Sequence, residues 1–170
     1  MAAPTLLDPN FRRTVVLVAD HGEAGALGLV LNRASEVSVE AAAAELGPLA
    51  GEGEVVYVGG PVQPDGLIVV AEWVDPEPGA MEVLPGIGVV TAAMDPTAVT
   101  ARRVRVFAGH AGWGPGQLER EIGREDWILE PAEPEDLFAP APAALWSRVL
   151  ERKGGQFAIL ARMPPDPSVN

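Results

Sequence analysis

The sequence of 170 residues contains no cysteine and a single lysine, Lys153. Without cysteine, the chain cannot form a disulfide, a thiolate nucleophile or a zinc site with cysteine ligands. Positive charge is scarce as well, because 12 Lys and Arg residues stand against 24 Asp and Glu residues, and the net charge is −12 at pH 7. The densest basic cluster is Arg102, Arg103 and Arg105, and the alternation of a strand would split it between two faces. Nucleic-acid binding usually needs a concentrated basic face, so we expect no nucleic-acid partner.

Long hydrophobic runs are also absent. No apolar stretch approaches the roughly 18 residues that cross a membrane as a helix. Residues 1–11 have neither the basic start nor the apolar centre of a signal peptide. We therefore expect a cytoplasmic protein without a membrane partner. The length suits one domain, which we place at residues 1–163, and we expect the proline-containing tail at 164–170 to be disordered.

Apolar, β-branched runs predict most of the strands. Residues 14–19 (TVVLVA) and 26–31 (ALGLVL) flank a turn, DHGEAG, at residues 20–25, a pattern typical of an antiparallel hairpin. Further short runs predict strands at residues 54–58, 67–73, 88–91, 126–130 and 157–161. The sequence GGPV at residues 59–62 predicts a corner that ends the strand before it.

Helices are predicted at fewer places. Residues 37–46 are rich in alanine, with Ser35 as a capping residue and Gly47-Pro48 as a stop. Residues 96–101 can form one helical turn. Residues 142–152 make the clearest helix, because an apolar stripe precedes Gly154-Gly155; the stripe consists of Leu145, Trp146, Val149 and Leu150. The acidic connection at residues 130–136 is expected on the solvated surface.

The stretch from residue 104 to 122 (VRVFAGHAGWGPGQLEREI) combines a strand, a glycine-rich corner and a short helix. Glycine allows a positive φ and close backbone approach, so we expect a tight bend at residues 109–116. Pro115 suits the first helical position, with Gly114 as N-cap. Gln117 can then reach back to the N–H of the cap residue, and Gly123 can end the helix.

Several strands with few, irregularly placed helices exclude a regular β-α-β alternation. We therefore predict an α+β fold: a single domain with a mixed, mostly antiparallel sheet that can close into a barrel, with a few short helices.

Four stretches together carry a specific combination of residues. They comprise Asp8, Phe11, His21, Gly25, Gly28 and Asn32; then GGPV at 59–62; then Gly109, Ala111, Gly112, Trp113, Gly114, Gly116, Gln117, Leu118 and Glu119; then Trp127, Phe138 and Trp146. In these stretches the chain resembles the YqgE/AlgH family, an uncharacterised bacterial group. The resemblance implies an α+β fold with a barrel-like mixed sheet and no established reaction. Some members carry a transcriptional-regulator label, which the charge of this chain does not support.

The candidate binding residues lie at the two glycine-rich turns: His21, His110, Trp113, Gln117 and Glu119. Histidine can act as an acid, a base or a ligand near neutral pH, although each histidine can equally hydrogen-bond turn backbone. The glycine-rich corner before a helix could bind an anion; the simpler interpretation is a structural corner with Trp113 packed in the core. No metal-binding or cofactor motif is present, so we expect neither a metal nor a cofactor.

These observations favour a non-catalytic binding or regulatory protein, with an unknown protein or small molecule as partner. The alternative is a hydrolase-like enzyme that uses His21 or His110 with a nearby carboxylate, and a DNA-binding regulator is the least favoured class. A pocket that places His21 beside a carboxylate would favour the enzyme. A continuous exposed apolar patch around the corner would favour a protein partner.

Overall fold

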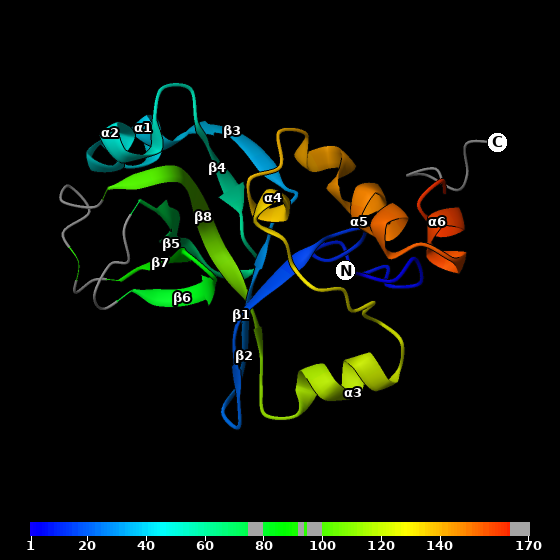
Figure 1. The fold of residues 1–170 in the computed structure, drawn as a ribbon. Helices are drawn as coiled ribbons and strands as arrows, with labels where there is room; N and C mark the ends of the chain where they lie inside the picture. Colours follow the sequence, from blue (N-terminus) through cyan, green and yellow to red (C-terminus); the bar gives the residue numbers. More distant parts are fainter. Residues whose placement is uncertain (75–79, 92–93, 95–99, 164–170) are drawn as a thin grey trace.

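The computed structural model describes residues 1–74, 80–91, 94 and 100–163 (Figure 1). The tail at 164–170 and most of the helical turn expected at 96–101 lie outside the described residues. The sheet contains a row of strands in which each is hydrogen-bonded to the next. In order along this row, the strands are β1 (Val16–Gly22), β2 (Gly25–Val30), β8 (Ala101–Trp113), β5 (Val62–Trp73), β7 (Ile87–Val90) and β6 (Met81–Leu84). Because β1 and β6, the two ends of this row, also contact each other, the sheet is nearly barrel-shaped.

Two further strands join the sheet at β8. β4 (Val55–Val58) runs parallel to β8, and β3 (Ala34–Ser38) pairs antiparallel with β4. The other pairings between strands are antiparallel. The short helices are α1 (Val39–Ala42), α2 (Gly47–Ala50), α3 (Gln117–Gly123), α4 (Pro134–Leu137), α5 (Leu145–Lys153) and α6 (Gln156–Leu160), with 3₁₀ turns at Ala44–Leu46 and Pro142–Ala144. The α+β prediction with a mixed, mostly antiparallel and barrel-like sheet is confirmed. None of the described helices is long and apolar enough to cross a membrane.

The first hairpin is confirmed, but its turn is shorter than predicted. Val16 pairs with Val30 and His21 with Ala26 in antiparallel register, and the turn is Glu23 and Ala24 alone. Residues 20–22, expected in a loop, therefore belong to β1. His21 therefore lies on a strand, and its pairing with Ala26 of β2 fixes its backbone.

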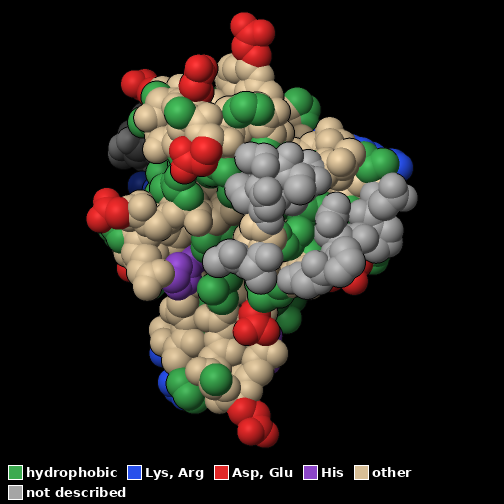
Figure 2. Space-filling view, turned by 90° about the vertical axis from the view of Figure 1, so that its left-hand side faces the viewer, with side chains coloured by type: hydrophobic (Ala, Val, Ile, Leu, Met, Phe, Trp, Pro, Cys, Tyr) green, Lys and Arg blue, Asp and Glu red, His purple; other side chains and the backbone are tan. Residues whose placement is uncertain are grey.

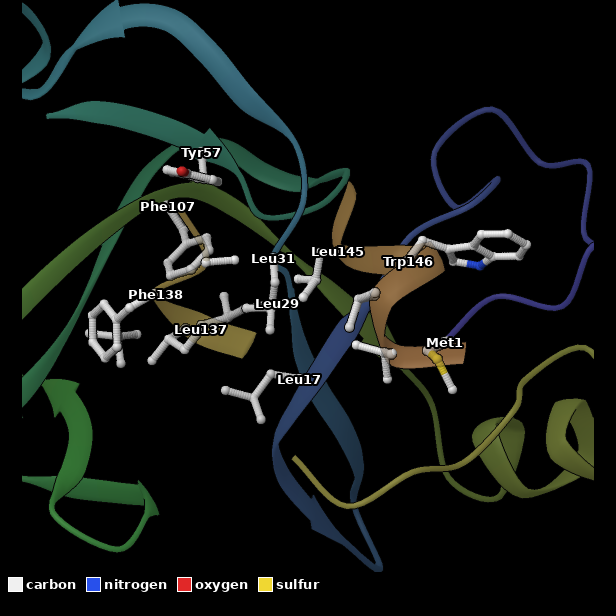
Figure 3. Close-up of a cluster of buried hydrophobic side chains, with 14 of the residues drawn as sticks. Met1, Leu17, Leu29, Leu31, Tyr57, Phe107, Leu137, Phe138, Leu145 and Trp146 are labelled. Atoms are coloured by element: carbon white, nitrogen blue, oxygen red, sulfur yellow. The ribbon is translucent and has the colours of Figure 1, made fainter. Parts of the chain in front are cut away.

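Three buried clusters organise the packing. The largest lies among β1, β2, β5 and β8 and is filled from α4 and α5; Figure 3 shows Leu29, Phe107, Leu137 and Phe138 in it. A second cluster lies against α1 and α2. The third lies between the end of β8 and α3. The stripe predicted for α5 is confirmed, since all of its members are buried. The clusters together cover both faces of β8.

Other predictions about elements were wrong. The predicted helix at 37–46 is split into the end of β3, α1 and a 3₁₀ turn, with Ser38 rather than Ser35 as the cap. Residues 126–130 form only an isolated bridge between Trp127 and Ala2. Residues 157–161, predicted as a strand, lie largely in α6. In the acidic connection, Asp136 is buried rather than solvated, because it pairs with Arg152.

Candidate functional site

The sequence GGPV crosses over a strand. β4 pairs with one edge of β8 and β5 with the other, so residues 59–61 must carry the chain across the β8 backbone. A β-carbon on Gly60, whose φ is +155°, would lie 2.2 Å from the carbonyl carbon of His110. A β-carbon on Gly109, whose φ is +67°, would lie 2.5 Å from the carbonyl oxygen of Gly60. Since no side chain fits between the two backbones, this pair of glycines is a steric requirement of the crossing.

Beyond the crossing, β8 continues further than predicted. It runs to Trp113, so Gly109 and Gly112 lie within a strand rather than in a bend. The helix begins two residues later than expected, with Gly116 (φ 65°) and not Gly114 at its N-cap. The predicted contact of Gln117 is nevertheless present, because its Oε1 accepts a hydrogen bond from the N–H of Gly114 at 3.1 Å.

Trp113 is held in a network centred on Glu121. The indole Nε1 atoms of Trp113 and Trp127 donate to Glu121 Oε2 at 2.9 and 2.8 Å, and Gln117 Nε2 donates to Oε1 at 2.9 Å. Burial acts to raise the pKa of Glu121, but these hydrogen bonds outweigh it and lower the pKa. Trp113 is 6% exposed and stacks on Phe11. Trp113 therefore belongs to the core that fastens α3 to the sheet.

His21 and Glu119 form an exposed pair. His21 Nε2 lies 2.6 Å from Glu119 Oε1, and about half of each side chain is exposed to solvent. The pKa of Glu119 is lowered by a backbone hydrogen bond and by His21. A histidine oriented by a carboxylate is one part of a hydrolytic site, which also needs a nucleophile and a cavity for substrate. Neither residue lines the cavities described below.

His110 lies apart from the other candidates. Successive residues of a strand point to opposite faces, so His110 and Gly112 face away from Trp113. Consistent with this, a β-carbon on Gly112 would lie 4.0 Å from the His110 ring and 3.6 Å from Val62 Cγ2. The structure thus brings together His21, Trp113, Gln117 and Glu119 through α3, and it leaves His110 on the opposite face.

The face near His110 carries exposed aliphatic side chains. We name as the aliphatic patch Val37, Val58, Val62 and Leu67, which are 50%, 45%, 40% and 37% exposed. Val37, Val58 and Leu67 line one groove of about 330 Å³, together with Ala108 and Asp65. Val62 is the register partner of His110. Figure 2 shows one face of the molecule, on which exposed hydrophobic side chains and a histidine are visible.

The sequence reasoning missed the aliphatic patch. Val56 and Val58 lie on the same face of β4, yet Val56 is 4% exposed and Val58 is 45% exposed. Val56 belongs to the buried cluster that packs against α1 and α2, and Val58 does not. The only signal available in the sequence was the position of these residues next to GGPV.

A larger hollow of about 730 Å³ lies between the end of α3 and α6, lined in part by Trp127, Leu129 and Phe157. Its cationic groups are paired, Arg124 with Asp126 and Lys153 with Glu130. None of the predicted site residues lines it. Across the described residues, no group of at least three His, Cys, Asp or Glu side chains could hold a metal ion.

Comparisons with known proteins agree with the resemblance seen in the sequence. A family model described as AlgH-like (DUF179) matches residues 1–158. UPF0301 proteins of Streptomyces coelicolor (SCO2948) and Streptomyces avermitilis are 43% and 44% identical to this chain, over all of it and 92% of each relative.

Two solved structures are similar to this fold. Protein DIP2367 of Corynebacterium diphtheriae superposes with a TM-score of 0.86 at 28% identity, covering 95% of this chain and 88% of that one. The solution structure of AlgH from Pseudomonas aeruginosa, also a UPF0301 protein, gives a TM-score of 0.73 at 30% identity, covering 96% of this chain and 91% of that one. From its sequence, its strand crossing and these similarities, the chain belongs to the AlgH-like family.

Proposed function

We propose that this chain is a non-catalytic binding protein that captures a segment of another protein on the aliphatic patch. The observation that carries the proposal is the exposure of Val37, Val58 and Leu67 around one groove. Exposed apolar groups that gather on one face of a protein mark interaction sites more often than scattered ones do. The patch also adjoins the crossing, where the glycine-rich motifs fix the backbone most tightly.

The charge around the patch defines the chemistry of the partner. Asp65 lines the groove. The chain as a whole carries a charge of −12. A segment with aliphatic side chains flanked by Lys or Arg is therefore complementary to this surface.

The edge of β3 supports an extended conformation for that segment. Among the described strands, β3 pairs only with β4, so its other edge is free to form main-chain hydrogen bonds. Ser35 and Val37 on this strand line the groove. A strand added at this edge would direct alternate side chains into the groove.

The pair of His21 and Glu119 supports a second candidate, a hydrolase-like enzyme. Its 2.6 Å contact would orient a histidine base. Hydrolysis of an activated ester that is lost in both His21→Ala and Glu119→Gln would establish this enzyme. The same rate in the wild type and both variants would exclude this pair as its site.

Photo-crosslinking from two exposed positions tests the binding proposal. A photoreactive residue at Val58 is compared with one at Ile159, which is 72% exposed on α6. We expect position 58 to label one discrete segment rich in aliphatic and basic residues in cell extract, and position 159 not to label it. Equal labelling at both positions, or a labelled segment without basic residues, would contradict the proposal.

A further inference from the structure

Arg105 is a buried cation on the face of β8 opposite the aliphatic patch. Its register partner on β5 is Val70, and its exposed fraction is 8%. The guanidinium carbon lies 4.1 Å from the centroid of the Tyr57 ring. Tyr57 in turn lies at the edge of the largest core cluster, beyond Phe107 (Figure 3).

Two nitrogen atoms of the Arg105 side chain lack partners among the described residues. Nε and Nη1 are enclosed and form no hydrogen bond. Two other arginines of the chain have carboxylate partners, because Arg103 bonds Glu72 and Glu135, and Arg152 bonds Asp136. The contact with the Tyr57 ring uses the flat face of the guanidinium and leaves its in-plane N–H groups unpaired. Enclosed N–H groups normally have a partner, and the described part of the chain provides none for these two atoms of Arg105.

The chemistry of the guanidinium indicates what that partner is. Its planar set of N–H donors matches the paired oxygens of a carboxylate or phosphate group. Among the described residues the Tyr57 hydroxyl has no hydrogen-bond partner and is not fully enclosed, so it can donate to a ligand. We propose that Arg105 and Tyr57 form a binding site for the oxyanion group of a small ligand. This site is independent of the aliphatic patch, because Tyr57 and Val58 point to opposite faces of β4.

The negative charge of Glu54 acts against the binding of an anion at Arg105 and Tyr57. Burial has the largest effect on both groups of the site: it raises the pKa of Tyr57 and lowers the pKa of Arg105. The charge of Glu54, an exposed residue, has a smaller effect and raises both pKa values. A negative charge so close repels an incoming anion. Removing that charge should therefore strengthen binding, whereas removing Arg105 should abolish it.

The experiment follows the Nε–H signals of arginine by nuclear magnetic resonance, in separate titrations with inorganic phosphate and with acetate. We expect a saturable shift of the Arg105 signal, and the ion that produces it at lower concentration identifies phosphate or carboxylate as the preferred group. The variants are followed instead by the backbone amide signals around residues 57 and 105, which do not require the arginine. In these spectra Arg105→Gln should show no saturable shift, and Tyr57→Phe should weaken affinity about tenfold by loss of one hydrogen bond to a charged group. Glu54→Gln should bind more tightly. Arg102→Gln, at an exposed position of β8, is the matched control and should bind like wild type.

The absence of a saturable shift with either ion would overturn the proposal, because water alone would then satisfy Arg105. Equal binding by Arg105→Gln and wild type would overturn it as well. If Arg105→Gln does not fold, the other two variants decide, since wild-type affinity in both Tyr57→Phe and Glu54→Gln would contradict the site.

Discussion

Gly60 is the residue at which the crossing tolerates least change. A β-carbon there would meet the backbone of His110 at 2.2 Å, and its φ of +155° is unfavourable for other residues. We predict that Gly60→Ala lowers the free energy of unfolding by about 4 kcal/mol or more, in the range of severe single-site effects. Urea unfolding measures this change.

Gly123 provides the matched control for that experiment. A β-carbon on Gly123 has no neighbour within 4 Å, and the residue ends α3. Gly123→Ala should be neutral or stabilise by up to about 1 kcal/mol, the difference in helix propensity. Similar unfolding midpoints for Gly60→Ala and Gly123→Ala would show that the crossing does not constrain the backbone.

Trp113 has a structural role that can be measured in two steps. Trp113→Ala removes a ring packed against Phe11 and Trp127 and should cost about 3–5 kcal/mol of unfolding free energy. Trp113→Phe keeps an aromatic ring but loses the hydrogen bond to Glu121, so its cost should be clearly smaller. Denaturant unfolding of both variants checks this order, and an unchanged stability of Trp113→Ala would remove Trp113 from the core.

Among the elements, those with strong local signals were predicted from the sequence. The hairpin of β1 and β2 has two apolar runs around a turn, and α5 has a full stripe from Leu145 to Leu150 followed by glycine. The segment FAILA was misassigned because a short apolar run fits a buried helix as well as a strand. Gly154 ends α5 as its C-cap, as predicted, and Gly155 is the N-cap of α6, so the glycine pair separates two helices rather than a helix and a strand.

Long-range contacts decided the elements that the sequence did not predict. Residues 37 and 38 extend β3 because this segment pairs with β4, and the N–H of Val39 bonds the carbonyl of Glu54. The helix predicted there relied on alanine content, a weak preference that tertiary pairing can override. The exposure of the aliphatic patch depends on tertiary packing, since Val56 is buried against α1 and α2 and Val58 is not. The enclosure of the Arg105 side chain depends on tertiary packing as well. Candidate residues such as His21 and Glu119 were identified, but their 2.6 Å contact joins positions 98 apart in the chain.

The contact between α4 and α5 depends on an ion pair that acid should break. Asp136 accepts from Arg152 Nη1 and Nη2 at 2.8 and 2.7 Å. Burial acts to raise the pKa of Asp136, but Arg152 and the Glu133 backbone lower it below 3.8. We predict that Asp136→Asn costs about 2 kcal/mol near pH 7, because a buried side chain loses its charge-assisted hydrogen bonds, while Arg152 keeps its pair with Glu133.

The direction of the pKa shift of Asp136 determines how the cost of Asp136→Asn depends on pH. A carboxyl whose pKa is lower in the folded state stabilises the fold above its unfolded pKa of 3.8 and loses this effect as pH falls through the folded pKa. The difference in stability between wild type and Asp136→Asn should therefore shrink below about pH 4. A difference that is constant from pH 7 to pH 3 would contradict the ion-pair account.

At the scale of the whole molecule, the charge of −12 opposes binding to nucleic acid. Within the described residues Arg103 is also neutralised by Glu72 and Glu135, so the densest basic cluster does not form a basic face. We predict no specific DNA binding in a titration at about 150 mM salt. A dissociation constant near 10⁻⁸ M or tighter, as is typical of specific DNA-binding proteins, would refute this.

In the whole molecule, the structural motifs are separate from the proposed binding surface. Glycine-rich motifs and Trp113 build a backbone crossing and fasten α3 to the sheet, whereas the exposed aliphatic patch on the other face of β8 is the proposed binding surface. His21 and Glu119 lie on the α3 side and are not part of that surface.

The most direct test is the affinity of a synthetic peptide with the sequence labelled from position 58, measured by fluorescence anisotropy against folded variants. The account predicts that Val58→Ser weakens binding about tenfold or more, as expected for a central apolar contact. His21→Ala and the exposed control Ile159→Ser should bind like wild type. Wild-type affinity for Val58→Ser, or loss of binding in His21→Ala alone, would contradict the central claim.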